Sequence, residues 1–301
     1  MNERKGILFV LATALISGVS IYVNGMGVKF ANPYVFTGMK NLLVGLGLLL
    51  FMLLMKEWQG IKQLKKKDWL RLGLIGLVGG AVPFLLFFKG LSMTSAAQGG
   101  FIHKTLFIYV SFLAIIFLKE KLNKSVLLGL GALLLGNFLF LDIQVQTVSW
   151  GDVLILGATL LWAVEIILSK RLLATLSPRI VAWGRMFFGA AFIAVFLMLT
   201  DQLGSLFAYN PEQWKWVAIT SVLLLGYVYT FYHGLKYTRA SVATSVLALG
   251  APITSLIAFV ATEGVTWSPQ KIGGVGVLII GIVLVVGLES FRNMLKLKRP
   301  I

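Results

Sequence analysis

Five ionisable residues stand in the middle of long apolar stretches, namely Lys40, His103, Lys104, Glu165 and Arg185. A charged side chain at the centre of a bilayer costs roughly 2.5–3.5 kcal/mol on insertion scales, so such residues usually face a cavity or one another. Here the cations outnumber the single acid. This positive excess favours an anionic or zwitterionic solute over a lipophilic cation.

His103 and Lys104 lie deepest in these stretches. They stand about ten residues into the apolar run 96–118, roughly 15 Å along a helix and near the bilayer midplane. Two hypotheses follow for Lys104: it contacts the solute's carboxylate, or it pairs with Glu165. His103 titrates near physiological pH in one interpretation and is a hydrogen-bonded interior histidine in the other.

Glu165 and Trp162 share a helical face, since they are three residues apart. Glu165 is a candidate for carrying a coupling proton, because burial favours the protonated form of a carboxyl group. Its alternative roles are a pair with Lys104 or a place in a solvated vestibule. Trp162 is a candidate for stacking on solute, or else a packing or interfacial tryptophan. Tyr229, near mid-depth, is a further candidate for lining a cavity.

Lys40 and Arg185 each follow a proline by seven residues, about 10 Å into a helix. We expect them to guard the two mouths of a pathway; the alternative is that they extend to lipid phosphates or helix-terminal carbonyls. Pro252 lies in mid-span after Gly250 and Ala251, where it removes a backbone hydrogen bond. It predicts a broken helix at a cavity, with a tolerated kink as the alternative.

The elements that position these residues are apolar runs long enough to cross a membrane. The chain has 301 residues, of which 58% are hydrophobic and 13% charged, and its mean hydropathy is +0.90. Because the runs are continuously apolar rather than alternating, they predict helices and exclude barrel strands. The predicted spans are 7–28, 34–55, 69–88, 96–118, 125–141, 153–169, 180–199, 214–235, 242–262 and 272–288.

The second half of the chain repeats the first at an offset of about 145 residues. Gly6, Pro33 and Lys40 correspond to Gly151, Pro178 and Arg185, and the 90–96 segment corresponds to 234–240. Each half holds an odd number of spans, so the two copies must be inverted relative to each other. The sequence therefore predicts an all-α membrane protein of ten transmembrane helices, arranged as two inverted five-helix repeats.

Basic residues gather at alternate helix ends, which sets the expected orientation. The connection 56–71 is rich in Lys and Arg, whereas its counterpart 201–215 holds only Lys215. Both termini are therefore expected in the cytoplasm, with the protein in the plasma or inner membrane of the cell. The expected domains are a first repeat at 1–141, a connection at 142–150, a second repeat at 151–290 and a basic cytoplasmic tail at 291–301.

Composition and spacing exclude several other functions. The chain has no cysteine and two distant histidines, and it shows no metal cluster, nucleophile–base pair or phosphate loop. We therefore expect no cofactor, no metal and no enzyme activity. The net charge of +16 invites a nucleic-acid interpretation, but the basic residues lie at helix ends. The expected partners are the lipid bilayer and a small-molecule solute.

Several short motifs, in order and in duplicate, resemble the drug/metabolite transporter superfamily, specifically its two-module EamA-type members. The motifs are Leu168-Ser169-Lys170-Arg171, Ser177-Pro178 followed by Arg185, the 90–96 and 234–240 segments, Leu118 to Asn123, and Pro252. The resemblance implies a ten-helix carrier with a central cavity lined mostly by the first, third, fourth, sixth, eighth and ninth helices. One departure is that the fourth span lacks the proline often found near 106–109.

The sequence thus predicts a secondary-active transporter that exports a small polar metabolite, such as an amino acid or organic acid, by alternating access. One alternative is a proton-coupled multidrug exporter of lipophilic cations that uses Glu165. Another, of a different class, is a non-transporting membrane scaffold or receptor module, in which all interior charges are paired.

Overall fold

The computed structural model describes residues 3–27, 32–57, 59–94, 96–141, 148–206, 208–261 and 267–287. Within these ranges the chain is helical, without strands, and has ten helices long and apolar enough to cross a membrane. This confirms the predicted fold class. The predicted tail at 291–301 and most of the connection at 142–150 lie outside the described residues.

The ten spans are built from the following elements, where η marks a 3-10 or π segment. In the first half, the first span is α1 (Glu3–Gly27) and the second is α2 (Pro33–Leu54), which is followed by the short α3 (Gln59–Lys62). The third span consists of α4 (Lys66–Ile75), η2 (Gly76–Ala81) and α5 (Val82–Leu91). The fourth consists of α6 (Ala96–Lys104) and α7 (Leu106–Leu118), and the fifth is α8 (Lys124–Leu141). In the second half, the sixth span is α9 (Trp150–Leu172) and the seventh is α10 (Pro178–Leu199), which is followed by η3 (Leu203–Leu206). The eighth span is α11 (Pro211–Tyr237). The ninth consists of α12 (Ala240–Val246), η4 (Leu247–Leu249) and α13 (Gly250–Ala261), and the tenth is α14 (Pro269–Val286).

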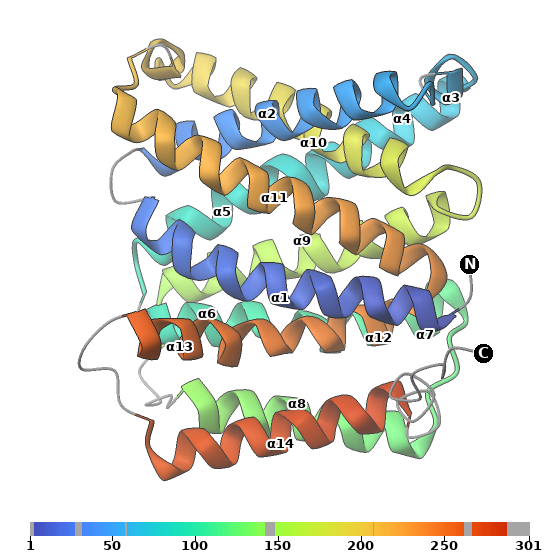
Figure 1. The fold of residues 1–301 in the computed structure, drawn as a ribbon, viewed down its shortest axis with the longest axis vertical. Helices are drawn as coiled ribbons and strands as arrows, with labels where there is room; N and C mark the ends of the chain where they lie inside the picture. The colour runs from blue at the N-terminus through green and yellow to red at the C-terminus, as the bar shows by residue number, and fades with distance from the viewer. Residues whose placement is uncertain are drawn as a thin grey trace, which may run out of the picture.

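The helices lie roughly side by side across the long axis of the molecule (Figure 1). The pair α2 and α10 occupies one end of this axis, and the pair α8 and α14 occupies the other. Between them lie α1, α9, α11 and the broken third, fourth and ninth spans. Residues far apart in sequence, from both repeats, therefore meet in the middle of the bundle.

Several spans begin at a polar cap followed directly by proline. Asn32, Ser177, Asn210 and Ser268 cap α2, α10, α11 and α14, and each accepts a hydrogen bond from a first-turn backbone N–H. Proline suits the first helical position because its missing N–H has no partner there anyway. These local signals fix where the spans start.

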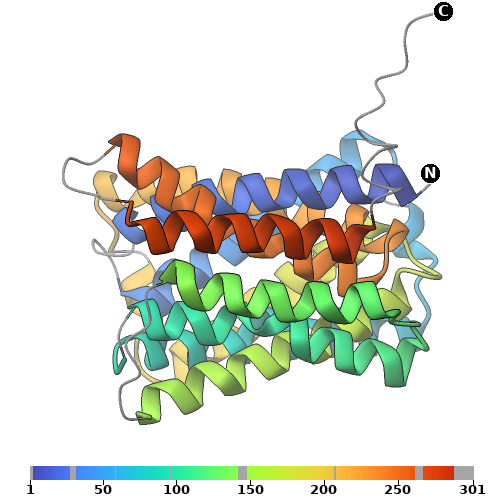
Figure 2. The same cartoon turned by 90° about the horizontal axis from the view of Figure 1, so that it is seen from below.

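The pair α8 and α14 joins the two repeats through equivalent glycines (Figure 2). A Cβ at Gly129 would lie 2.8 Å from the Gly281 carbonyl oxygen, and one at Gly281 would lie 2.9 Å from that of Gly129. Gly136 and Gly274 approach each other in the same reciprocal way, at 3.0 Å in both directions. Small residues allow this close backbone contact in a membrane, where helices gain little from hydrophobic association.

Three spans depart from regular α-helix near their middle. The third contains the π segment η2, and the ninth tightens to 3-10 at η4, just before Pro252. The fourth breaks at Thr105, whose hydroxyl donates to the Ile102 carbonyl at 2.6 Å. The fourth span therefore breaks without a proline, and the hydroxyl-to-backbone bond accounts for its tighter turn. Since Thr105 and Gly250 are equivalent positions, both repeats are broken at the same place.

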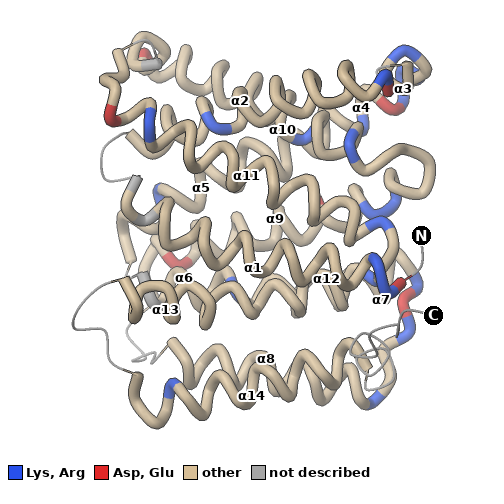
Figure 3. The backbone as a smooth tube through the Cα atoms, in the orientation of Figure 1, with Lys and Arg blue, Asp and Glu red and all other residues tan. Residues whose placement is uncertain are grey.

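Charged residues crowd one end of the spans, the end at which α1 begins (Figure 3). We call this the basic end. The helical middles are almost free of charge along the described tube. The few charges that remain there are the ones that sequence analysis singled out.

A glycine substitution tests the contact between the repeats. We expect Gly274→Val to lower the free energy of unfolding by about 2 kcal/mol, because its side chain would meet the backbone of Phe140 at 2.8 Å. Gly276→Val is the matched control, since nothing lies within 4 Å of a Cβ there. Thermal unfolding in detergent measures both; equal melting temperatures for the two variants would contradict the tight α8–α14 contact.

Candidate functional site

The candidate site begins with two backbone carbonyls in the third span. Pro83 has no N–H, so the carbonyl of Gly79, four residues earlier, loses its usual helical partner. The π segment Gly76–Ala81 around it widens the helix locally. In hydrocarbon a freed carbonyl needs a partner from elsewhere in the protein.

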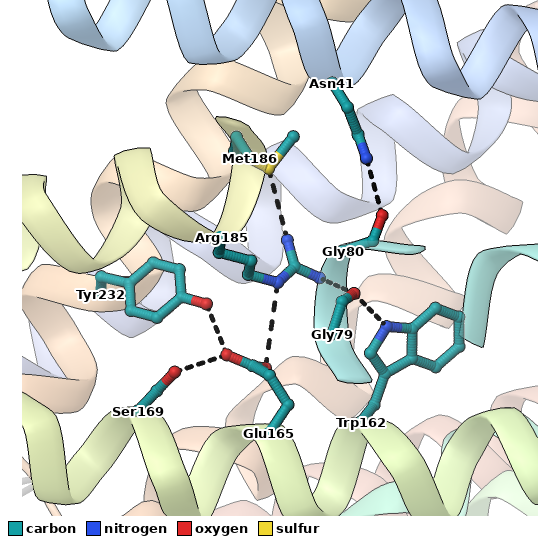
Figure 4. Close-up of polar contacts among 9 residues, drawn as sticks. All are labelled: Asn41, Gly79, Gly80, Trp162, Glu165, Ser169, Arg185, Met186 and Tyr232. Atoms are coloured by element: carbon teal, nitrogen blue, oxygen red, sulfur yellow. Dashed lines mark hydrogen bonds and ion pairs between the residues drawn. The ribbon is translucent and has the colours of Figure 1, made fainter. Parts of the chain in front are cut away.

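Side chains from three other spans supply these partners (Figure 4). The Gly79 carbonyl accepts from Trp162 Nε1 at 3.0 Å and from an Arg185 guanidinium nitrogen, Nη2, also at 3.0 Å. The Gly80 carbonyl accepts from Asn41 Nδ2 at 2.8 Å. The break in the third span is thus tied to α2, α9 and α10 at once.

Glu165 completes this buried cluster. It is only 2% exposed, and its Oε1 accepts from the Tyr232 hydroxyl at 2.6 Å and from the Ser169 hydroxyl at 2.5 Å. Its Oε2 lies 3.9 Å from Arg185 Nε (Figure 4). Glu165 therefore pairs with Arg185 rather than with Lys104. The two hydroxyls donate the hydrogen bonds that a buried carboxylate also needs.

His103 lies against a group of aromatic rings beside this cluster. Its ring centroid lies 4.9 Å from that of Trp162 and 5.3 Å from that of Phe87. Phe84 packs against Trp162 at 5.3 Å and also under the Arg185 guanidinium. The His103 Nδ1 atom is buried and has no hydrogen-bond partner among the described residues.

Lys104 reaches the point where the broken fourth and ninth spans approach α1. A Cβ placed on Gly250 would lie 3.5 Å from Lys104 Nζ and 3.2 Å from the Ser17 hydroxyl oxygen. Among the described residues, no carboxylate lies within the 4.0 Å of an ion pair with Lys104. Its ammonium group is therefore a charge near the predicted midplane for which the described residues provide no counter-ion.

Lys40 lies apart from the Glu165 cluster, towards the end opposite the basic end. Its ammonium group donates to the amide oxygen of Asn24 on α1 and lies over the Phe36 ring. Asn24 in turn donates to the Ser20 hydroxyl at 2.9 Å. These partners are neutral, and no described carboxylate lies within ion-pair distance of Lys40.

Two further candidates, Tyr229 and Pro252, lie outside the Glu165 cluster. The Tyr229 ring lies 4.2 Å from that of His233 and 6.0 Å from that of Phe51, on the part of α11 nearer the basic end. Pro252 is buried in the first turn of α13, next to the 3-10 turn that breaks the ninth span. The structure thus brings Trp162, Glu165 and Arg185 together with His103 beside them, and sets Lys104, Lys40 and Tyr229 in separate surroundings.

Sequence reasoning missed the partners that hold the cluster, namely Asn41, Gly79, Gly80, Ser169 and Tyr232. A signal was present in Gly79-Gly80-Ala81-Val82-Pro83, where paired glycines precede a proline in mid-span. Such a proline frees a carbonyl in the same way as the one at 252. Asn41 and Tyr232 carried no comparable signal, because only the packing of spans brings them to this point.

Within the described ranges, no group of three or more His, Asp or Glu side chains is placed to hold a metal ion. The clustered groups are hydrogen-bond donors and acceptors together with one ion pair.

Removing one partner of the buried pair should be costly. We expect Glu165→Gln and Arg185→Gln each to lower the free energy of unfolding by about 3 kcal/mol, because each leaves an opposite charge buried and unbalanced. The double variant should lose clearly less than the sum of the two. Thermal unfolding of the four proteins gives this cycle, and strict additivity would show that the two charges do not interact.

Comparison with known proteins agrees with this architecture. A solved crystal structure superposes with a TM-score of 0.77 at 17% sequence identity, covering 97% of this chain and 99% of its own, which shows a shared fold. Uncharacterized transporter YyaM of Bacillus subtilis is 26% identical, over 81% of this chain and 82% of its own length. Riboflavin transporter ImpX of Fusobacterium nucleatum is 27% identical, over 76% of this chain and 80% of its own length.

The family comparison covers both halves of the molecule. The EamA-like transporter family matches residues 4–141 and again 149–287, which are the two halves recognised from the internal repeat. The protein is therefore a multi-pass membrane transporter that belongs to the EamA-like transporter family.

Proposed function

We propose that this transporter exports a small anionic or zwitterionic metabolite, such as an amino acid or organic acid, by alternating access. The observation that carries the proposal is the ammonium group of Lys104, near the midplane and without a counter-ion among the described residues. A charge at this depth is stabilised when a ligand of opposite charge binds it. The solute's carboxylate is the proposed partner.

The surroundings of Lys104 support its role in a moving site. It lies at the ends of two broken helices, one from each repeat, and a break leaves a point about which the halves of a span can tilt. Gly250, on the facing break, leaves room for the ammonium group and the Ser17 hydroxyl. Binding of a carboxylate here would engage both repeats at once.

Glu165 is the proposed site of a coupling proton, with His103 as the alternative. In the conformation described, the Tyr232 and Ser169 hydroxyls both donate to Glu165 Oε1. In this proposal a proton binds Glu165 when its contact with Arg185 opens. Lys40 and Arg185 are the proposed pathway residues on the two sides.

The alternatives fit these contacts less well. An exporter of lipophilic cations needs an acid open to the solute, whereas Arg185 already balances Glu165. A non-transporting scaffold needs all interior charges paired, whereas Lys40 and Lys104 have no acidic partner in the described parts of the chain.

One observation favours a second candidate, a solute with a planar aromatic ring. The rings of Phe87 and Trp162 lie against His103, the residue that precedes Lys104, and aromatic faces bind planar rings well. The relative named for riboflavin transport makes riboflavin a sensible member of the solute panel.

Lys104→Gln tests the main proposal. Reconstituted in liposomes and assayed against a panel of amino acids, organic acids and riboflavin, the native protein should transport an anionic or zwitterionic solute. The variant should lose at least about tenfold in kcat/KM for that solute, equivalent to about 1.4 kcal/mol, because the carboxylate loses its charge partner.

Lys67→Gln is the matched control, because this exposed lysine lies at the start of the third span, far from the breaks. It should retain native transport. An unchanged rate and affinity in Lys104→Gln would remove this residue from the mechanism and with it the present proposal.

We further propose that the basic end faces the cytoplasm of a plasma or inner membrane. The absence of cysteine in the chain allows a direct test. Ser205→Cys, exposed at the opposite end, should react with a membrane-impermeant maleimide in intact cells. Lys67→Cys should react only after permeabilisation, and the reverse pattern would invert the proposed orientation.

A further inference from the structure

The two repeats link the same three positions, but through different contacts. In the second repeat, residue 165 of α9 contacts both residue 169 of α9 and residue 185 of α10. In the first repeat, residue 24 of α1, the equivalent of residue 169, contacts both residue 20 of α1 and residue 40 of α2. Both trios contain a basic residue from the second span of the repeat and two polar residues one helical turn apart on the first span.

The chemistry of the two trios differs at one position. Arg185 has the carboxylate of Glu165 beside it, whereas the equivalent of Glu165 in the first repeat is Ser20. Asn24 donates to the Ser20 hydroxyl and accepts from Lys40, and neither Ser20 nor Asn24 carries a negative charge. Arg185 therefore has a counter-ion within the protein, whereas its counterpart Lys40 has none in the parts of the chain that the structure describes.

We propose that a carboxylate of the transported solute binds beside Lys40, in the position that the Glu165 carboxylate holds beside Arg185. The site consists of Lys40, Asn24 and Ser20. In this proposal the Lys40 ammonium group and the Ser20 hydroxyl donate to the carboxylate, just as a cation, Arg185, and a hydroxyl, that of Ser169, lie about Glu165, although the position equivalent to Ser169 is Asn24. A charge-assisted bond of this kind is stronger than the Lys40–Asn24 bond to a neutral amide, which the solute would displace.

This site and the surroundings of Lys104 both include residues of α1. Ser17, close to Lys104, and Asn24, bonded to Lys40, are seven residues apart on α1. Seven residues complete about two turns, so both lie on one face, about 10 Å apart along the axis. The inference rests on the proposed function, because it requires the solute to carry a carboxylate. It adds a second binding site for that solute, between the midplane and the end opposite the basic end.

The first test places a carboxylate in the site and needs no solute. Ser20→Glu restores in the first repeat the acid of the second, and Ser20→Gln is its neutral match in size. We expect the Ser20→Glu protein to melt higher than the Ser20→Gln protein by roughly 3 °C or more. In a Lys40→Gln background this difference should vanish or reverse. An equal difference in both backgrounds would overturn the inference, because a carboxylate would then gain nothing from Lys40.

The second test uses acetate as the probe, compared with acetamide at equal concentration and at an ionic strength set by sodium chloride. In the Lys104→Gln background, acetate should raise the melting temperature in a saturable way and acetamide should not. Adding Lys40→Gln or Ser20→Glu should remove the rise, whereas Lys40→Arg should keep it. A rise that persists without Lys40, or no rise with Lys40 present, would overturn the second site.

These variants separate the two claims. If acetate stabilises the native and Lys104→Gln proteins equally, the Lys104 proposal fails while the Lys40 site stands. If acetate stabilises the native protein but not the Lys104→Gln protein, the Lys40 site fails while the Lys104 proposal stands.

Discussion

Hydrocarbon offers no hydrogen bonds and no screening, and this constraint governs the centre of the molecule. Pro83 frees the Gly79 carbonyl, and the protein answers with donors from two other spans, Trp162 and Arg185. Arg185 in turn requires Glu165, and Glu165 is held by Tyr232 and Ser169. One broken turn therefore ties together the third, sixth, seventh and eighth spans.

In both repeats, packing differs between the last span and the broken fourth span. The glycines of α8 and α14 interlock reciprocally, with backbones too close to admit a side chain. The fourth and ninth spans, by contrast, are broken at equivalent positions, Thr105 and Gly250. Close packing resists rearrangement, whereas a break in a helix absorbs it at small cost. The proposed alternating access therefore assigns motion between the repeats to the breaks and not to the glycine contact.

Charge balance distinguishes residues that hold the fold from residues open to a solute. Arg185 and Glu165 balance each other's charge, and replacing either should lower the free energy of unfolding. Lys40 and Lys104 have no carboxylate within ion-pair distance among the described residues, and the proposed function assigns their charges to an anionic solute. Under that proposal, the same residue type, a cation in a span, has two different roles that depend on what faces it.

The sequence alone determined the spans, their duplication and their inversion, because these depend on apolar length, on an odd number of crossings and on basic residues at helix ends. It also pointed to the buried charges, because an ionisable residue within a long apolar run can be recognised from the sequence without any structure. Only the tertiary structure decided the partners: that Glu165 faces Arg185 and not Lys104, that Asn41 and Tyr232 belong to the cluster, and that the fourth span breaks without a proline. Partners on different spans are set by helix rotation and packing depth, and no local pattern in the chain encodes those.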